Sequence, residues 1–159
     1  MKPYADTNFL TRLYLSLPGT SEAVQEMDRL RNAGREALPI TWYHRLETIN
    51  AFQLLLFTSA QSTHQPRVTL EQAAAAQANF RSDLSRPTFF RETPLVLSQL
   101  EHQFEELALR HTARYGFRTY DLLHVASALT LKCDTFWSFD AKASMLAELA
   151  ELEGLKTRS

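Results

Sequence analysis

The stretch TYDLLHVASALTLKCDTFWSFD, residues 119–140, decides the fold that the sequence predicts. Its first half, from about Tyr120 to Lys132, is predicted to be a helix. Its second half, Asp134–Phe139, is rich in aromatic residues, which is typical of a strand, and Asp140 follows directly. A helix that leads into a strand is a unit of parallel sheets that are flanked by helices.

The same alternation runs along the rest of the chain. Ser21, Thr41 and Thr69 are predicted to cap helices, and Gly34 and Gly116 to end them. The expected strands are Lys2–Ala5, Leu38–Thr41 and Thr88–Glu92, and a last one near Leu155–Thr157. The expected helices are Asn8–Leu15, 21–32, 41–58, 69–84, 95–115 and 142–153, with a loop at Ser59–Arg67. This order predicts an α/β fold in which functional residues gather at the carboxyl ends of the strands.

Composition bounds the kind of protein. A chain of 159 residues with 45% apolar residues is expected to form one domain, residues 1–159, with its own core. The one cysteine, Cys133, excludes an internal disulfide, and no secretory signal or membrane span is expected, so we expect a soluble cytoplasmic protein. A net charge of −1 excludes an evenly basic nucleic-acid binder, although arginine supplies 13 of the 17 basic residues and suits phosphate.

Acidic residues stand where sites are expected. Asp6 ends the first strand and Asp140 ends the strand 134–139, and each is followed by a helix. Asp121 lies in the first turn of its helix, behind Thr119. Each has a purely structural alternative, because aspartate caps helices and interacts favourably with their N-terminal dipole, with Thr119 as the cap in the third case.

Glu47 lies in the middle of the helix 41–58. An apolar stripe runs along that helix through Trp42, Leu46, Ile49, Phe52 or Gln53, and Leu56. Glu47 lies at the edge of the stripe with Ala51 and Leu54, which predicts that it is partly covered. The alternative is a boundary glutamate that reaches water.

Clustered carboxylates raise one another's pKa values and need compensation. The usual compensation is a hard cation, and Mg²⁺ and Mn²⁺ prefer oxygen ligands. Such ions activate water and neutralise charge on phosphate, which connects an acidic cluster to cleavage of phosphodiesters.

The motifs resemble those of the PIN-domain nucleases over nearly the whole chain, from Met1 to about Leu155. The resemblance rests on four acids in the order and local context of that family. They are Asp6 in Asp6-Thr7-Asn8, Glu47 in Leu46-Glu47-Thr48-Ile49-Asn50-Ala51, Asp121 in Asp121-Leu122-Leu123-His124-Val125-Ala126, and Asp140 in Ser138-Phe139-Asp140.

The resemblance implies a three-layer α/β/α sandwich around a mainly parallel sheet of roughly five strands. It implies a Mg²⁺- or Mn²⁺-dependent ribonuclease in which the four acids are the metal ligands and catalytic residues. Thr7, Asn8 and Ser138 would support them. A chain of this length resembles the VapC-type toxin of a bacterial toxin–antitoxin pair, which implies RNA as substrate, a small antitoxin as partner and a homodimer.

Some residues depart from the family pattern, and other functions stay open. The family often has threonine where Ser138 stands and an aliphatic residue where Pro3 stands, and the last strand is poorly apolar. The main alternative is a non-catalytic PIN-like binding or scaffold module. A phosphatase with Asp6 as nucleophile lacks the second aspartate of its usual Asp-x-Asp pattern.

The remaining candidate residues are interpreted as structural. His124 follows Asp121 by three residues and could form a metal site with it, but we expect a packed histidine with one hydrogen bond. The sequence has no glycine-rich phosphate loop and no Gly-x-Ser-x-Gly motif. The aromatic residues that could stack on bases are predicted to lie in the core: Trp42, Tyr43, Phe52, Phe57, Phe89 and Phe90.

Overall fold

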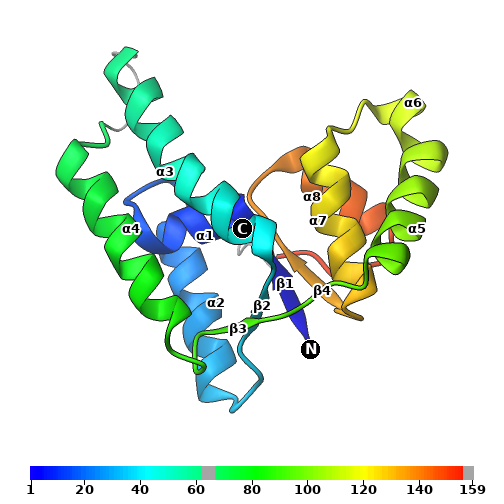
Figure 1. Cartoon of the computed structure of the whole chain (residues 1–159), viewed down its shortest axis with the longest axis horizontal. Helices are drawn as coiled ribbons and strands as arrows, with labels where there is room; N and C mark the ends of the chain where they lie inside the picture. The colour runs from blue at the N-terminus through cyan, green and yellow to red at the C-terminus, as the bar shows by residue number, and fades with distance from the viewer. Residues whose placement is uncertain (62–66, 156–159) are drawn as a thin grey trace. The chain divides into compact units, whose positions relative to one another are not determined.

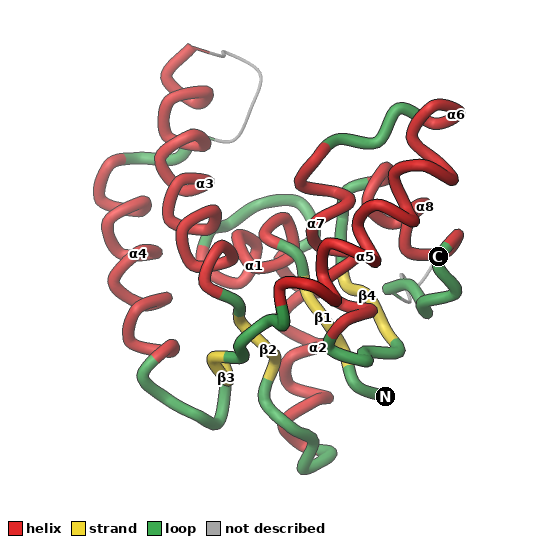
Figure 2. The backbone as a smooth tube through the Cα atoms, turned by 45° about the vertical axis from the view of Figure 1, so that its right-hand side comes forward, coloured by secondary structure: helices red, strands yellow, loops and turns green. Residues whose placement is uncertain are grey.

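A computed structural model of the chain describes residues 1–61 and 67–155 (Figures 1 and 2). It divides into two compact units, Met1–Asp6 with Pro94–Ser159, and Thr7–Thr93. Each unit combines helices with one pair of parallel strands, which confirms the predicted α/β class. The single domain over residues 1–159 stays a prediction.

The first unit is built on a short parallel pair, β1 (Pro3–Ala5) and β4 (Thr135–Trp137). Tyr4 pairs with Phe136 at the centre of the register. A parallel bridge adds Glu153 on the other side of β4, where the Phe136 amide donates to the Glu153 carbonyl at 2.8 Å. The end of the chain thus pairs with β4 two residues before the predicted last strand, whose residues 156 and 157 lie outside the described ones.

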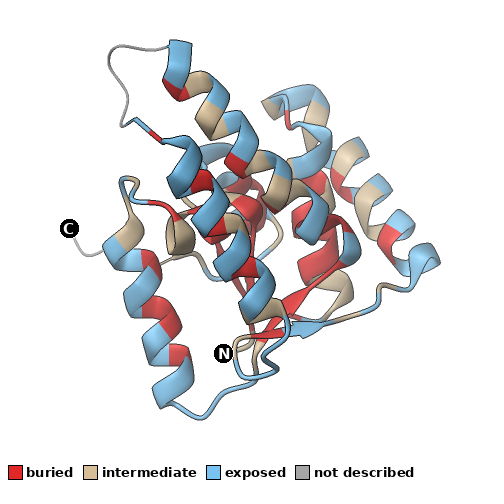
Figure 3. Cartoon of the chain, turned by 60° about the vertical axis from the view of Figure 1, so that its left-hand side comes forward, coloured by how far each residue is buried: buried red, intermediate tan, exposed pale blue. Residues whose placement is uncertain are grey.

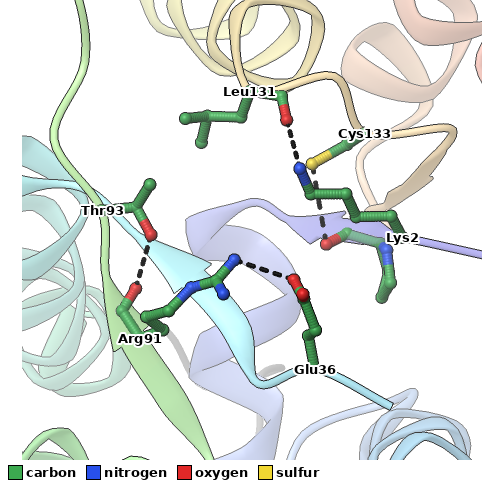
Figure 4. Close-up of polar contacts among 7 residues, drawn as sticks. Lys2, Glu36, Arg91, Thr93, Leu131 and Cys133 are labelled. Atoms are coloured by element: carbon green, nitrogen blue, oxygen red, sulfur yellow. Dashed lines mark hydrogen bonds and ion pairs between the residues drawn. The ribbon is translucent and has the colours of Figure 1, made fainter.

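Helices pack on this pair of strands and form an apolar core with it. They are α5 (Leu97–Leu107), a π-helical turn η1 (Ala108–Thr112), α6 (Ala113–Tyr115), α7 (Thr119–Thr130) and α8 (Ala141–Leu149). Leu122, Val125 and Ala126 of α7 pack into one cluster with Tyr4 and Phe136 of the strands. Figure 4 shows polar contacts at the start of this unit, where the Lys2 ammonium donates to the Leu131 carbonyl at 2.6 Å and the Cys133 thiol lies 3.9 Å from the Pro3 carbonyl.

The second unit pairs β2 (Leu38–Ile40) with β3 (Phe90–Glu92), again in parallel. Its helices are α1 (Thr7–Tyr14), α2 (Thr20–Asn32), α3 (Trp42–Gln61) and α4 (Leu70–Leu84). Phe52, Phe80 and Phe90 meet edge to face, with ring centroids 6.0 to 6.2 Å apart. Figure 4 also shows the exposed ion pair between Arg91 of β3 and Glu36, at 2.9 Å.

The strands are fewer and shorter than predicted. Four strands of three residues each form two separate parallel pairs within the described residues, and the sheet of roughly five strands is not confirmed. Proline contributes to this, because Pro39 stands at the centre of β2 and has no N–H to donate. The buried residues of β1, β2 and β4 are coloured red in Figure 3.

Of the apolar stripe predicted along α3, only Phe52 is buried. The helix buries Tyr43, His44, Thr48 and Phe52, whereas Trp42 is 63% exposed. Both faces of α3 carry apolar residues, so spacing alone does not identify the buried one. The predicted core aromatics divide accordingly: Tyr43, Phe52 and Phe90 are buried, Phe89 is intermediate, and Trp42 and Phe57 are exposed.

Most helix ends follow the predicted capping residues. Thr69 caps α4 through a reciprocal pair of hydrogen bonds with Gln72, and the Thr41 hydroxyl accepts from the His44 amide. Ser21 is not a cap, because α2 starts one residue earlier, after Gly19 in the left-handed region at φ 94°. α3 continues to Gln61, so the predicted loop Ser59–Arg67 starts later, and its residues 62–66 lie outside the described ones.

Two other helices are shorter than predicted. The helix expected directly after Pro94 starts at Leu97, and it reaches Tyr115 through the π-helical turn before Gly116. α8 ends at Leu149, and Glu151 follows with a left-handed backbone at φ 61°. Over residues 1–61 and 67–155, we find no helix long and apolar enough to span a membrane.

Candidate active site

Asp6 stands at the carboxyl end of β1 and is almost fully buried. Its amide donates to the Trp137 carbonyl at 3.0 Å, which continues the β1–β4 ladder by one residue. Its side chain is 4% exposed. The Ser138 hydroxyl donates to Asp6 Oδ2 at 2.6 Å.

Ser138 connects the ends of both strands. Besides donating to Asp6, its Oγ accepts from the Asp140 amide at 2.9 Å. Because β1 and β4 are parallel, their carboxyl ends lie at the same edge of the pair, and one hydroxyl contacts the residues that follow both. The strand-end rule therefore brings Asp6, Ser138 and the backbone of Asp140 together.

Asp140 is also the N-cap of α8. Its Oδ1 accepts from the amides of Lys142 and Ala143, each at 2.9 Å. The structural alternative raised by the sequence is therefore realised. Capping occupies Oδ1, and Oδ2 of this exposed side chain is the oxygen that could face a ligand.

Asp121 lies in the first turn of α7 and, like Asp140, is both a candidate ligand and part of the start of a helix. Its Oδ2 accepts from the Arg118 amide at 3.0 Å. Arg118, with an extended backbone, occupies the N-cap position, so the structural alternative with Thr119 as the cap is not realised. The bond fixes the carboxylate of Asp121 at the N-terminal end of α7.

Glu47 lies on α3, in the second unit. The Thr7 hydroxyl donates to Glu47 Oε2 at 2.6 Å, and Glu47 is half-buried, as its position in α3 predicts. Asn8 lies in the same helix as Thr7, where its side-chain oxygen accepts from Arg12 at 2.7 Å. Two of the predicted supporting residues, Thr7 and Ser138, thus contact an acid of the predicted set through a hydroxyl.

The sequence predicts a packed His124 with one hydrogen bond and does not indicate the partner of that bond. His124 is buried and lies 3.0 Å from the Tyr4 hydroxyl, which confirms the packed histidine. The sequence gives no local signal for this partner, because Tyr4 and His124 are 120 residues apart.

The donor chemistry of the first unit fits a hard cation. Asp6, Asp121 and Asp140 offer only carboxylate oxygens, which Mg²⁺ and Mn²⁺ prefer, and a buried carboxylate such as Asp6 needs compensation. Among the side chains of residues 1–61 and 67–155, no group of three or more His, Cys, Asp or Glu is arranged so that it could hold a metal ion. The fit is therefore one of ligand type, and only Asp6 and Asp140 are linked at the strand edge, through Ser138.

Comparisons with known proteins identify a fold. No protein-family model matches the chain. No curated protein matches its sequence. Among solved structures, the chain is similar to VapC20 of Mycobacterium tuberculosis, a toxin that cleaves the sarcin-ricin loop, with 19% identity and a TM-score of 0.57 over 90% of this chain and 93% of that one. At this identity the similarity shows the fold alone: the chain has a VapC-like fold.

Proposed function

We propose that this chain is a Mg²⁺- or Mn²⁺-dependent endoribonuclease, the toxin of a toxin–antitoxin pair in the cytoplasm. The observation that carries the proposal is the contact of Asp6 with Ser138, and of Ser138 with Asp140, at the carboxyl ends of two parallel strands. The fold supports the proposal, because the chain is similar in structure to a toxin that cleaves the sarcin-ricin loop. We therefore take RNA as the substrate class and this loop as the first sequence to test.

The proposed residues have distinct tasks. Asp6, Asp121 and Asp140 would hold the cation, and Glu47 joins them on the sequence resemblance. The hydroxyls of Ser138 and Thr7 orient the Asp6 and Glu47 carboxylates through bonds of 2.6 Å. When bound, Mg²⁺ or Mn²⁺ lowers the pKa of a coordinated water and neutralises charge on the phosphate.

The test is cleavage of an RNA oligonucleotide that carries the sarcin-ricin loop. We expect purified protein to cleave it with Mn²⁺ or Mg²⁺ and not with EDTA. Asp6→Asn keeps the size of the side chain and removes its charge, so activity should fall at least about a hundredfold, as for the loss of a group that acts on the transition state. The matched control is Asp28→Asn, an exposed aspartate of α2, which should cleave normally. Unchanged cleavage by Asp6→Asn would refute the mechanism.

A second candidate function is a non-catalytic module that binds RNA or protein. It is favoured by the engagement of Asp121 and Asp140 in starting α7 and α8, a role that needs no metal. An assay that separates bound, free and cleaved RNA on one gel discriminates the two. Retarded RNA that stays intact with Mn²⁺ present supports the module.

The antitoxin and the homodimer are also proposals. A groove of about 580 Å³ in the second unit supports a protein partner. Its apolar lining includes Leu46, Ile49 and Leu84, and Arg45 and Arg81 lie beside them. Trp42 continues the exposed apolar surface of α3. Co-purification of a small protein with the tagged chain tests the antitoxin, and light scattering of the purified chain tests the dimer.

A further inference from the structure

A buried hydrogen bond joins the first strand to α7. The Tyr4 hydroxyl and His124 Nδ1 lie 3.0 Å apart, and the two side chains are 0% and 4% exposed. The Tyr4 ring stacks on Phe136 of β4 and meets the His124 ring edge to face, with centroids 5.8 Å apart in both pairs. Because both residues are buried, any effect on a substrate or a dissolved ion must act through neighbouring residues.

Tyr4 and His124 each share a face of their strand or helix with one of the proposed acids. Side chains two apart on a strand project to the same side, so Tyr4 and Asp6 share a face of the extended chain, which the Asp6 amide continues along β4. Residues three apart on a helix share a face, so Asp121 and His124 share one on α7.

The step from Tyr4 to Asp6 and the step from His124 to Asp121 also run in the same direction. α7 leads into β4, which is parallel to β1, so α7 runs antiparallel to the strands. Moving from Tyr4 to Asp6 goes toward the carboxyl ends of the strands, and moving from His124 back to Asp121 goes the same way. The step is about 6.6 Å along the strand and about 4.5 Å along the helix.

We propose that the Tyr4–His124 hydrogen bond is a positioning pair that fixes the Asp6 carboxylate relative to that of Asp121, so that both can ligate one divalent cation. This inference rests on the proposed metal-dependent function. It assigns His124 to the support of the site, in place of the direct metal ligand that an Asp-x-x-His motif could suggest.

The test is the affinity of the protein for Mn²⁺, measured by titration calorimetry in the absence of RNA. Tyr4→Phe keeps the ring and removes the hydroxyl. We expect Mn²⁺ to bind about tenfold more weakly, the lower range for residues that orient metal ligands. The KM for RNA at saturating Mn²⁺ should stay as in the wild type, because the substrate does not touch this buried pair.

The matched control is Tyr14→Phe. Tyr14 is partly buried, and its hydroxyl donates to Asp83 at 3.0 Å in the second unit. This variant also loses a tyrosine hydrogen bond and should lower thermal stability to a similar degree. Its affinity for Mn²⁺ should equal that of the wild type.

A second pair of variants keeps the proposal testable if Tyr4→Phe does not fold. His124→Asn offers an amide that can donate or accept near the position of Nδ1, so it should largely retain Mn²⁺ affinity, whereas His124→Leu should weaken it. Two results would overturn this inference and leave the proposed function standing. One is an equal affinity for Mn²⁺ in the wild type, Tyr4→Phe and His124→Leu. The other is an equal loss of Mn²⁺ affinity in Tyr4→Phe and Tyr14→Phe. A wild-type chain that neither binds Mn²⁺ nor cleaves RNA would overturn the proposed function and this inference with it.

Discussion

The Ser138 hydroxyl is the group that most directly links the two strand ends. It donates to a carboxylate that is 4% exposed and accepts from the Asp140 amide. We expect Ser138→Ala to lower the free energy of unfolding by about 1–3 kcal/mol, since removing a hydrogen-bond partner from a buried polar group costs this much. Ser138→Thr keeps the hydroxyl and should lose less.

Chemical denaturation of the purified variants measures this effect. The matched control is Ser85→Ala, because the exposed Ser85 hydroxyl also donates a bond of 2.6 Å, to the Ser82 carbonyl. A change at such a surface position should stay within about 0.5 kcal/mol. Equal losses at the two serines would contradict a special role for the contact at Asp6.

Tyr14 gives a prediction about pH. Burial of the phenol, followed by the charge of Asp83 and their hydrogen bond, raises the pKa of Tyr14 far above its ordinary value of 10.0. A raised pKa favours the protonated form in the folded state. The contribution of Tyr14 to stability is therefore complete below about pH 10 and declines as the pH rises further.

Ultraviolet absorbance at 295 nm follows the ionisation of tyrosines. Between pH 9 and about pH 11, Tyr14→Phe should show the same rise in absorbance as the wild type, because Tyr14 does not ionise there. Stability should behave differently, and the advantage of the wild type over Tyr14→Phe should shrink above about pH 10. A smaller rise in absorbance for the variant would show that Tyr14 titrates normally.

Helix ends are the elements that the sequence predicts best, because capping is local chemistry. Thr41, Thr69 and Gly116 act where their residue types predict. The buried face of α3 was not predictable, because both of its faces are apolar and only the packed unit distinguishes Phe52 from Trp42. Strand bounds were too long for a similar reason, since the partner of a strand is remote in sequence.

Gly116 carries a prediction at the level of a helix end. Its backbone is left-handed, at φ 67°, and a Cβ there would meet nothing within 4 Å. The cost of Gly116→Ala is therefore conformational, about 1–2 kcal/mol in the free energy of unfolding, and Gly116→Asn should cost less. Gly154→Ala is the control, because its φ is not positive and its Cβ would lie 4.0 Å from Glu148 Oε1. Thermal unfolding of the three variants measures the difference, and equal losses for Gly116→Ala and Gly154→Ala would contradict the role of backbone conformation.

At the scale of the whole molecule, the alternation of helices and strands predicts that Asp6 and Asp140 follow strands of one parallel sheet. This is correct for their strands, because β1 and β4 are parallel neighbours. The contacts that complete the site were not predictable. Ser138 and Asp6 are 132 residues apart, and Tyr4 and His124 are 120 apart. Such pairs depend on the fold, whereas the residue types that form them can be recognised in advance.

Metal binding should be visible as stability of the whole chain. A ligand that binds only the folded state at about one hundred times its dissociation constant adds about 2.7 kcal/mol. For a protein of this length each kcal/mol raises the Tm by about 2–4 °C, so saturating Mn²⁺ should raise it by about 5–10 °C over EDTA. Asp6→Asn should lose most of this increase, because it removes the charge of the most buried of the proposed ligands. Asp28→Asn should keep the increase, and an equal rise in Tm for Asp6→Asn would place the cation elsewhere on the protein.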